Sequence, residues 1–128
     1  MEKLLLSEGE WKIMNVLWDN APASLMEIVK MLESDTGWSK STVFVMMKRL
    51  VSKEAVSVDT SGKVQLYVPL IKRSEAAERE TGSFLSKVYN GSVRMMLASL
   101  AGQKSLSKDD IDELRRILDD AEEKLDSK

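Results

Sequence analysis

Apolar residues in the first part of the chain recur at intervals of three and four positions, the spacing that places side chains on one face of an α-helix. This pattern predicts three helices, after Ser7, after Ser24 and from about Lys40 to about Lys53. Their inward faces are expected to hold Trp11, Met14, Leu17 and Trp18, then Leu25, Ile28, Val29 and Leu32, and then Val43, Met46, Met47 and Leu50.

The starts of these helices carry capping signals. Ser7 with Glu10, and Ser24 with Glu27, have the spacing of a capping box, in which a serine hydroxyl accepts a hydrogen bond from the backbone N–H three residues on. Ser39 occupies the same kind of position before the third helix. Breaks between the helices are expected at 20–22 and 34–37.

The hydrophobic period then changes from that of a helix to that of a strand. Residues 55–59 and 64–68 alternate between apolar and polar, the segment 60–63 between them contains Gly62, and Pro69 follows. This pattern predicts a β-hairpin. Three helices followed by a hairpin indicate a winged helix-turn-helix, a mainly α fold with one small β-hairpin that forms the wing.

The third helix has more apolar residues than one buried stripe requires. Phe44 and Val45 lie away from the inward face, among lysines and serines. A recognition helix in the DNA major groove would explain this second face, because phosphates and guanine attract lysine and thymine methyls attract apolar groups. The alternative is a helix whose second face covers protein. The expected DNA-contacting residues of this helix are Lys40, Ser41, Thr42, Phe44, Val45, Lys48 and Arg49.

Lys63 at the tip of the hairpin, beside Thr60 and Ser61, suits a contact with a DNA phosphate. A solvated turn would favour the same residue types, so both interpretations stay open. Lys72 and Arg73, just after the hairpin, have the same two interpretations.

The second half of the chain predicts a long helix that begins near Ser74, a break at 101–104, and a last helix capped by Ser107. Two amphipathic helices cannot bury their apolar stripes on themselves. We therefore expect residues 1–73 to form the DNA-binding domain and 74–128 a helical dimerisation domain. The dimer contacts are expected from Phe84, Leu85, Val88, Tyr89, Val93, Met96, Leu97, Leu100, Ile111, Leu114, Ile117 and Leu118.

Charge supports a nucleic-acid partner only locally. The 128-residue chain has a net charge of −2, but residues 39–73 hold seven basic and two acidic residues, a net charge of +5. The local field decides whether an anion binds, so the total charge does not argue against DNA.

Composition argues against catalysis and against several kinds of site. The chain has no Cys and no His, which excludes disulfides, Cys nucleophiles and the commonest general base and metal ligand. The acidic cluster at 109–113 lacks the spacing of a calcium loop and suits a helix N-terminus. We expect no enzyme activity, no metal and no cofactor. No apolar run reaches membrane-spanning length and no signal peptide is visible, so we expect a cytoplasmic protein without membrane insertion.

The order of these elements resembles the penicillinase repressor family of bacterial regulators (BlaI/MecI type). The resemblance covers nearly the whole chain. Similar stretches are LSEGEWKIMNVLWD in the opening helix, WSKSTVFVMMKRLVSKEAV around the recognition helix, VQLYVPLI in the second strand of the wing and LSKDDIDELRRIL in the last helix.

The resemblance implies a homodimeric repressor of a β-lactam-resistance operon, bound to a double-stranded DNA operator with dyad symmetry built on TACA and TGTA half-sites. Release in the family follows cleavage by a membrane-bound sensor protease at an Asn–Phe bond. Ser99 and Leu100 align with that bond here and are the candidate cleavage site. The copper-responsive branch uses cysteines that this chain lacks. The alternative function is a winged-helix protein–protein interaction module that does not bind DNA.

Overall fold

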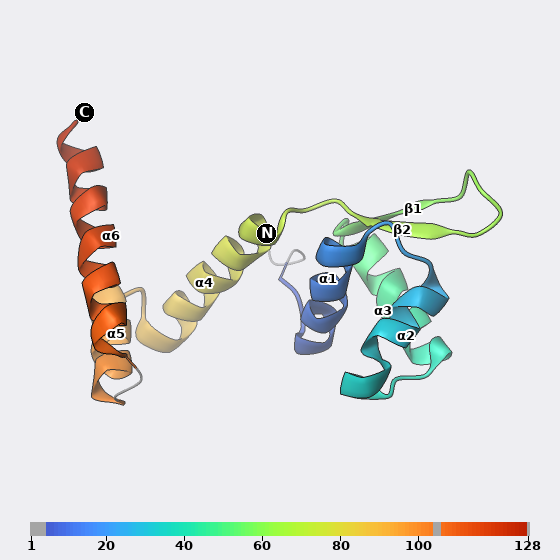
Figure 1. Ribbon diagram of the computed structural model, residues 1–128, viewed down its shortest axis with the longest axis horizontal. Coiled ribbons are helices and arrows are strands. Elements are labelled where there is room, and N and C mark those ends of the chain that lie inside the picture. Colours follow the sequence, from blue (N-terminus) through green and yellow to red (C-terminus); the bar gives the residue numbers. More distant parts are fainter. Residues whose placement is uncertain (1–4, 104–105, 128) are drawn as a thin grey trace. The chain divides into compact units, whose positions relative to one another are not determined.

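The computed structural model describes residues 5–103 and 106–127 (Figure 1). It confirms the predicted mainly α fold with one β-hairpin. The chain forms two compact units, Met1–Ser83 and Phe84–Lys128. In chain order, the elements are α1 (Glu8–Asn20), α2 (Leu25–Thr36), α3 (Lys40–Ser52), β1 (Val56–Asp59), β2 (Leu66–Pro69), α4 (Arg73–Tyr89), α5 (Val93–Gly102) and α6 (Lys108–Asp126).

The capping signals of the first three helices are confirmed. Ser7 and Ser24 form the predicted capping boxes, and the Ser39 hydroxyl accepts from the Thr42 backbone N–H at 3.2 Å. The break expected at 34–37 was placed too early, since α2 continues through Thr36. It ends at Gly37, whose φ of 65° is a left-handed conformation that glycine adopts without a Cβ clash.

The core of the first unit lies between α1, α2, α3 and the hairpin. Most predicted inward residues are buried, and Trp11, Trp18, Leu25, Val29 and Met46 pack partly buried against this core. Ile13 and the strand residues Val56 and Tyr67 join it as well. The fully buried apolar side chains of the three helices are Ile13, Met14, Leu17, Ile28, Val43, Met47 and Leu50.

The wing is anchored on both edges of β2. Strand β1 pairs with β2 in antiparallel register, with Val58 opposite Tyr67. On its other side Tyr67 pairs with Ala23: the Tyr67 N–H donates to the Ala23 carbonyl at 2.7 Å, and the Ala23 N–H donates back at 3.2 Å. The second strand was predicted at 64–68, but β2 begins two residues later, at Leu66, and includes Pro69. The loop at the wing tip is therefore longer than the sequence pattern indicated.

The start of α4 is held against α1. The indole N–H of Trp18 donates to the Ile71 carbonyl at 2.9 Å, and the guanidinium of Arg73 pairs with Asp19 at 3.1 Å while it lies 5.2 Å from the Trp18 ring centroid. These contacts hold the chain at 71–73. Helix α4 begins at Arg73, so Ser74 lies inside the helix, and the prediction that Ser74 is its N-cap is wrong. Arg73 thus has a structural role.

The prediction of one long helix from Ser74 to Leu100 is wrong, because the structure has two helices there, α4 and α5. The chain breaks at Asn90 and Gly91, whose φ angles of 51° and 86° are left-handed. Asn and Gly are the residues that tolerate this conformation, so the pair ends α4, and Ser92 caps α5. The break expected at 101–104 was placed two residues too early, since α5 continues through Gly102; Lys104 lies outside the described residues.

One buried ion pair joins the start of α1 to the end of α3. The Glu10 carboxylate is 2% exposed and accepts from the Lys53 ammonium and from the Ser7 backbone N–H. Lys53 also donates to the Leu5 carbonyl at 3.0 Å. Burial alone would raise the pKa of Glu10, but the hydrogen bonds from Lys53 and Ser7 and the charge of Lys53 lower it overall below its ordinary value of 4.5.

Because the folded state lowers this pKa, the ionised carboxylate contributes stability above about pH 4.5, and that contribution is lost as the pH falls through the folded-state value. We expect Glu10→Gln to lower the free energy of unfolding by about 2 kcal/mol near pH 7. The difference from the unmodified chain should shrink below about pH 4. Urea denaturation at both pH values measures it. Asp35→Asn, which breaks the exposed Lys12–Asp35 pair, is the control and should cost about 0.5 kcal/mol or less. A pH-independent penalty for Glu10→Gln would contradict this interpretation.

Candidate nucleic-acid interface

Helix α3 has one buried and one exposed face. Val43, Met47 and Leu50 are fully buried against the first unit, which fixes the rotation of the helix about its axis. The remaining positions then face outward, and all seven residues predicted on this helix for DNA contact are exposed, as is Lys63 in the wing. The structure therefore brings the predicted residues together on an open surface of the first unit.

The hydroxyl groups at the start of α3 belong to the cap. The Ser39 hydroxyl lies 3.1 Å from the Ser41 hydroxyl and donates to the Thr42 hydroxyl at 3.1 Å. This network aligns the two exposed hydroxyls of Ser41 and Thr42 with the N-terminus of the helix. A helix N-terminus with such donors favours a negatively charged partner.

The middle of α3 exposes two large apolar side chains. Phe44 is 43% exposed and Val45 is 48% exposed. The Lys48 ammonium lies 5.6 Å from the centroid of the Phe44 ring, within the range of a cation–π contact. Exposed apolar groups beside cations at one place on a surface indicate an interaction site.

The wing tip has an internal hydrogen bond. The Asp59 carboxylate accepts from the Ser61 hydroxyl at 2.7 Å and from the Ser61 backbone N–H at 2.9 Å, and these bonds lower the pKa of Asp59. Ser61 is therefore engaged in the turn. Lys63 stays exposed beside it.

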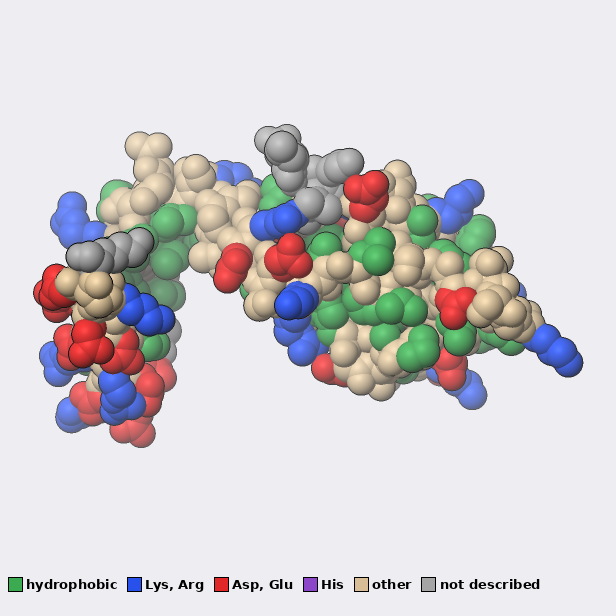
Figure 2. Space-filling view, turned by 90° about the horizontal axis from the view of Figure 1, so that it is seen from above, with side chains coloured by type: hydrophobic (Ala, Val, Ile, Leu, Met, Phe, Trp, Pro, Cys, Tyr) green, Lys and Arg blue, Asp and Glu red, His purple; other side chains and the backbone are tan. Residues whose placement is uncertain are grey.

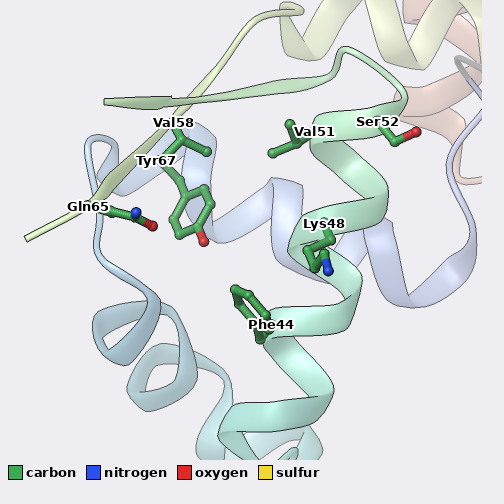
Figure 3. Close-up of a pocket in the computed structure, with 7 residues that line it drawn as sticks. All are labelled: Phe44, Lys48, Val51, Ser52, Val58, Gln65 and Tyr67. Carbon is green, nitrogen blue, oxygen red and sulfur yellow. The ribbon is translucent and has the colours of Figure 1, made fainter. Parts of the chain in front are cut away.

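A groove lies between α3 and the hairpin (Figure 3). Its volume is about 310 Å³, and Phe44 and Lys48 of α3 face Val58 and Tyr67 of the hairpin across it. Sequence analysis missed the hairpin side of this groove. Alternation along residues 64–68 places Tyr67 on the same side as Gln65, away from the apolar Val64, Leu66 and Val68, whereas the structure buries Tyr67 and leaves Leu66 and Val68 half-buried. The groove is lined by Phe44, Lys48, Val51, Ser52, Val58, Gln65 and Tyr67.

The residues predicted for dimerisation all lie in the second unit, which includes the end of α4 from Phe84 on. None of the described side chains of α5 or α6 is buried, and Ile117 and Leu118 are each 57% exposed. Phe84 and Tyr89 form an edge-to-face ring pair with centroids 5.9 Å apart. Phe84, Val88, Val93, Leu100, Ile111, Ile117 and Leu118 are exposed, and Leu85, Tyr89, Met96, Leu97 and Leu114 are half-buried.

The candidate cleavage bond between Ser99 and Leu100 lies inside α5. The Ser99 carbonyl accepts from the Gln103 backbone N–H at 3.1 Å, and the Ser99 hydroxyl accepts from the Gln103 side chain at 3.3 Å. The bond is therefore held in helical conformation near the helix end.

The structure shows two further features relevant to function. Among residues 5–103 and 106–127, no group of three or more acidic side chains is placed to hold a metal ion. Within the same ranges, no helix combines the length and the apolar character that crossing a membrane requires.

Comparison with known proteins gives a consistent result. The profile of the family described as "Penicillinase repressor" matches residues 6–120. The penicillinase repressor of Bacillus licheniformis is 32% identical over 115 residues, which cover 90% of each chain. The methicillin resistance regulatory protein MecI of Mammaliicoccus sciuri is 29% identical over 88% of this chain and 92% of its own. The solution structure of the DNA-binding domain of the repressor BlaI matches with a TM-score of 0.50 and 31% identity, over 55% of this chain and 85% of that one.

Proposed function

This chain belongs to the penicillinase repressor family, and we propose that it is a DNA-binding transcriptional repressor that acts as a homodimer on an operator with dyad symmetry. Both relatives match over 90% or more of their own length; one is named a penicillinase repressor and the other a methicillin resistance regulatory protein. The first unit resembles a domain that is described as DNA-binding. Such a protein acts where the chromosome is, so we place it in the cytoplasm and assign it no catalytic role.

The observation that carries this proposal is the outward face of α3. Lys40, Lys48 and Arg49 supply positive charge, and Ser41 and Thr42 supply hydroxyl groups at the helix N-terminus. This face is open, rigidly oriented by the buried face opposite, and suited to the major groove. Lys63 of the wing extends the cationic surface toward a neighbouring phosphate.

The second unit supports the homodimer. Ile117, Leu118 and Leu125 each expose more than half of their surface. Covering them with a second chain would remove apolar surface from water, which is favourable in free energy. The positions of α6 outside the apolar stripe are mostly acidic or basic, and Figure 2 shows red and blue side chains on the side of the second unit that it displays, so the apolar stripe is the face left for a partner. A dimer presents two recognition helices, and a dyad operator offers two half-sites.

Release from DNA follows from the same arrangement. One winged helix makes too few contacts for tight binding, so an event that separates the protomers removes about half of the contacts. We propose a β-lactam-resistance-type operon as the target and proteolysis or loss of the dimer as the inducing step. Cleavage by a membrane-bound sensor protease at Ser99–Leu100 would require local unwinding of α5, since a protease binds its substrate in extended conformation.

The first test is fluorescence anisotropy with a duplex that carries a TACA/TGTA dyad and with a scrambled duplex, at two salt concentrations. We expect preferential binding to the dyad that weakens as salt rises. Lys48→Ala should weaken binding to both duplexes by up to about tenfold and reduce the salt slope by about one, with folding intact. Lys30→Ala on α2 is the control and should change neither value. Absence of binding to either duplex at low salt would favour the protein–protein module.

Thymine contact by Phe44 and Val45 is tested by replacing each half-site thymine with deoxyuracil, which lacks only the methyl group. A methyl that packs against one of these side chains should contribute about fourfold in affinity. The loss of affinity on replacing thymine with deoxyuracil should therefore disappear in the variant that removes the contact, either Phe44→Ala or Val45→Ala. An equal uracil penalty in both variants and in the unmodified chain would assign the methyl contacts to other residues.

The dimer is tested by sedimentation and by operator affinity. The 14.4 kDa chain should sediment at about twice that mass, and Leu118→Glu should convert it to a monomer because a charge cannot enter the apolar contact. Operator affinity should then fall by at least about tenfold. Asp120→Ala, on the charged side of α6, is the control. A chain truncated after Leu100 should behave like Leu118→Glu, and equal operator affinity for the truncated and full chains would contradict the dimer mechanism.

A further inference from the structure

Helix α4 contains a glycine that its packing does not require. Gly82 lies well inside Arg73–Tyr89, where glycine makes a helix less stable than alanine does, because its backbone loses more conformational freedom on folding. Its backbone is helical, so no left-handed angle requires a glycine there. A Cβ atom at this position would have no neighbouring atom within 4 Å among the described residues, apart from its two chain neighbours and the adjoining helix backbone. Alanine would therefore fit.

Other glycines of the chain have a local reason in the structure. A Cβ atom at Gly9 would lie 2.5 Å from the Cε atom of Met46, so glycine allows the close approach of α1 and α3. Gly37 and Gly91 have left-handed φ angles of 65° and 86°. Neither reason applies to Gly82. The property that glycine supplies at this position is therefore freedom of the backbone within a helix.

The residues beside Gly82 weaken the helix further. Thr81 is β-branched and Ser83 has only moderate helix propensity. Sharp bends in helices occur mainly at proline, at glycine–serine pairs and where the hydrogen-bonded ladder is interrupted. Gly82 and Ser83 form such a pair. In the part of the chain that the structure describes, no side-chain hydrogen bond or ion pair holds 81–83, so only the helix backbone opposes a bend there.

The contacts before and after this glycine–serine pair belong to different units. Before it, α4 is attached to the first unit: Ala76 is 3% exposed, and the Trp11 indole N–H donates to the Glu80 carboxylate at 3.3 Å. After it, Phe84 packs edge-to-face against Tyr89. The boundary between the two compact units falls directly after the pair. The weak point of α4 thus lies where its attachment to the first unit ends.

A dimer that reads two half-sites must place both recognition helices at a separation that the operator sets. Each base pair added between the half-sites turns one relative to the other by about 35° and moves it by about 3.4 Å. We propose that Gly82 and Ser83 form a hinge in α4, which lets the two DNA-binding units of a dimer adjust to half-sites of different spacing. This inference rests on the proposed function of a dimeric repressor, and it adds a residue that determines specificity for operator spacing.

Close contact with a second chain is the other explanation for a glycine at this position, since a residue without a Cβ lets another helix approach closely. The residues four positions before and after Gly82 lie on the same face of α4. They are Glu78 and Ser86, which are both polar and exposed. Gly82 is therefore outside the apolar stripe that is proposed for the dimer, and this favours the hinge.

Gly82→Ala tests the inference, because it strengthens the helix without a steric clash. Affinity is measured by fluorescence anisotropy on a series of dyad duplexes whose half-site spacing increases by single base pairs. The ratio of affinity at the best spacing to that at the adjacent spacing should rise by about fivefold, the factor that corresponds to the helix propensities of alanine and glycine. Affinity for an isolated half-site should stay unchanged. Ala77→Gly, at an exposed position of α4 within the first unit, is the control and should leave the ratio unchanged.

A distance measurement tests the hinge without DNA. The chain has no cysteine, so Glu33→Cys, at an exposed position of α2, carries one spin label per protomer. Double electron–electron resonance then measures the distance between the two labels of a dimer. The distribution of distances should be broad with Glu33→Cys alone and when Ala77→Gly is added, and narrower when Gly82→Ala is added.

Equal widths in all three chains, together with an unchanged spacing ratio, would overturn the hinge. Conversion of the dimer to a monomer by Gly82→Ala would also overturn it and assign the glycine to a close contact between chains. If the Glu33→Cys chain gives no distance between labels, the proposed homodimer is wrong and the hinge has no role in spacing. A dimer whose distribution narrows with Gly82→Ala but which binds no duplex at low salt would support the hinge and overturn the DNA-binding function instead.

Discussion

The burial of Val43, Met47 and Leu50 determines most of what the first unit presents to its surroundings. A helix has one rotational degree of freedom about its axis, and three fully buried side chains on one face remove it. The opposite face is then fixed as well, which orients the hydroxyl groups at its start and the lysines along it. The Glu10–Lys53 pair adds to this constraint, since it connects the end of α3 to the start of α1 through a carboxylate that is excluded from water.

The wing depends on a second constraint, the pairing of β2 on both of its edges. A two-stranded hairpin alone is marginal in water, but the Ala23–Tyr67 bridge attaches it to the start of α2. The same bridge fixes the Tyr67 ring in the core with its hydroxyl at the edge of α3.

The second unit has the opposite character, because its helices bury none of their described side chains while they expose apolar stripes. Such helices gain little free energy as isolated elements, and tertiary packing supplies most helix stability in proteins. Under the proposed function, the stability of this unit and the affinity for DNA both depend on association with a second copy. A signal that acts on α5 could then change repression without altering α3, since the two functions lie in separate units.

The sequence by itself determined the helices of the first unit, their capping boxes, the hairpin and the division of α3 into two faces, because these follow from periodicity and local hydrogen bonds. It also indicated which residues of α3 are exposed and are proposed to contact DNA, since a face with both basic and apolar residues has no role in a core. It did not indicate the break at Asn90–Gly91, where a helical hydrophobic period continues across two residues that adopt left-handed angles. Only the tertiary structure decided that Arg73 packs on Trp18, that Glu10 is buried with Lys53 and that Tyr67 reaches the groove beside Phe44. These depend on contacts between residues far apart in the chain, and no local pattern specifies which distant side chain will meet a given one.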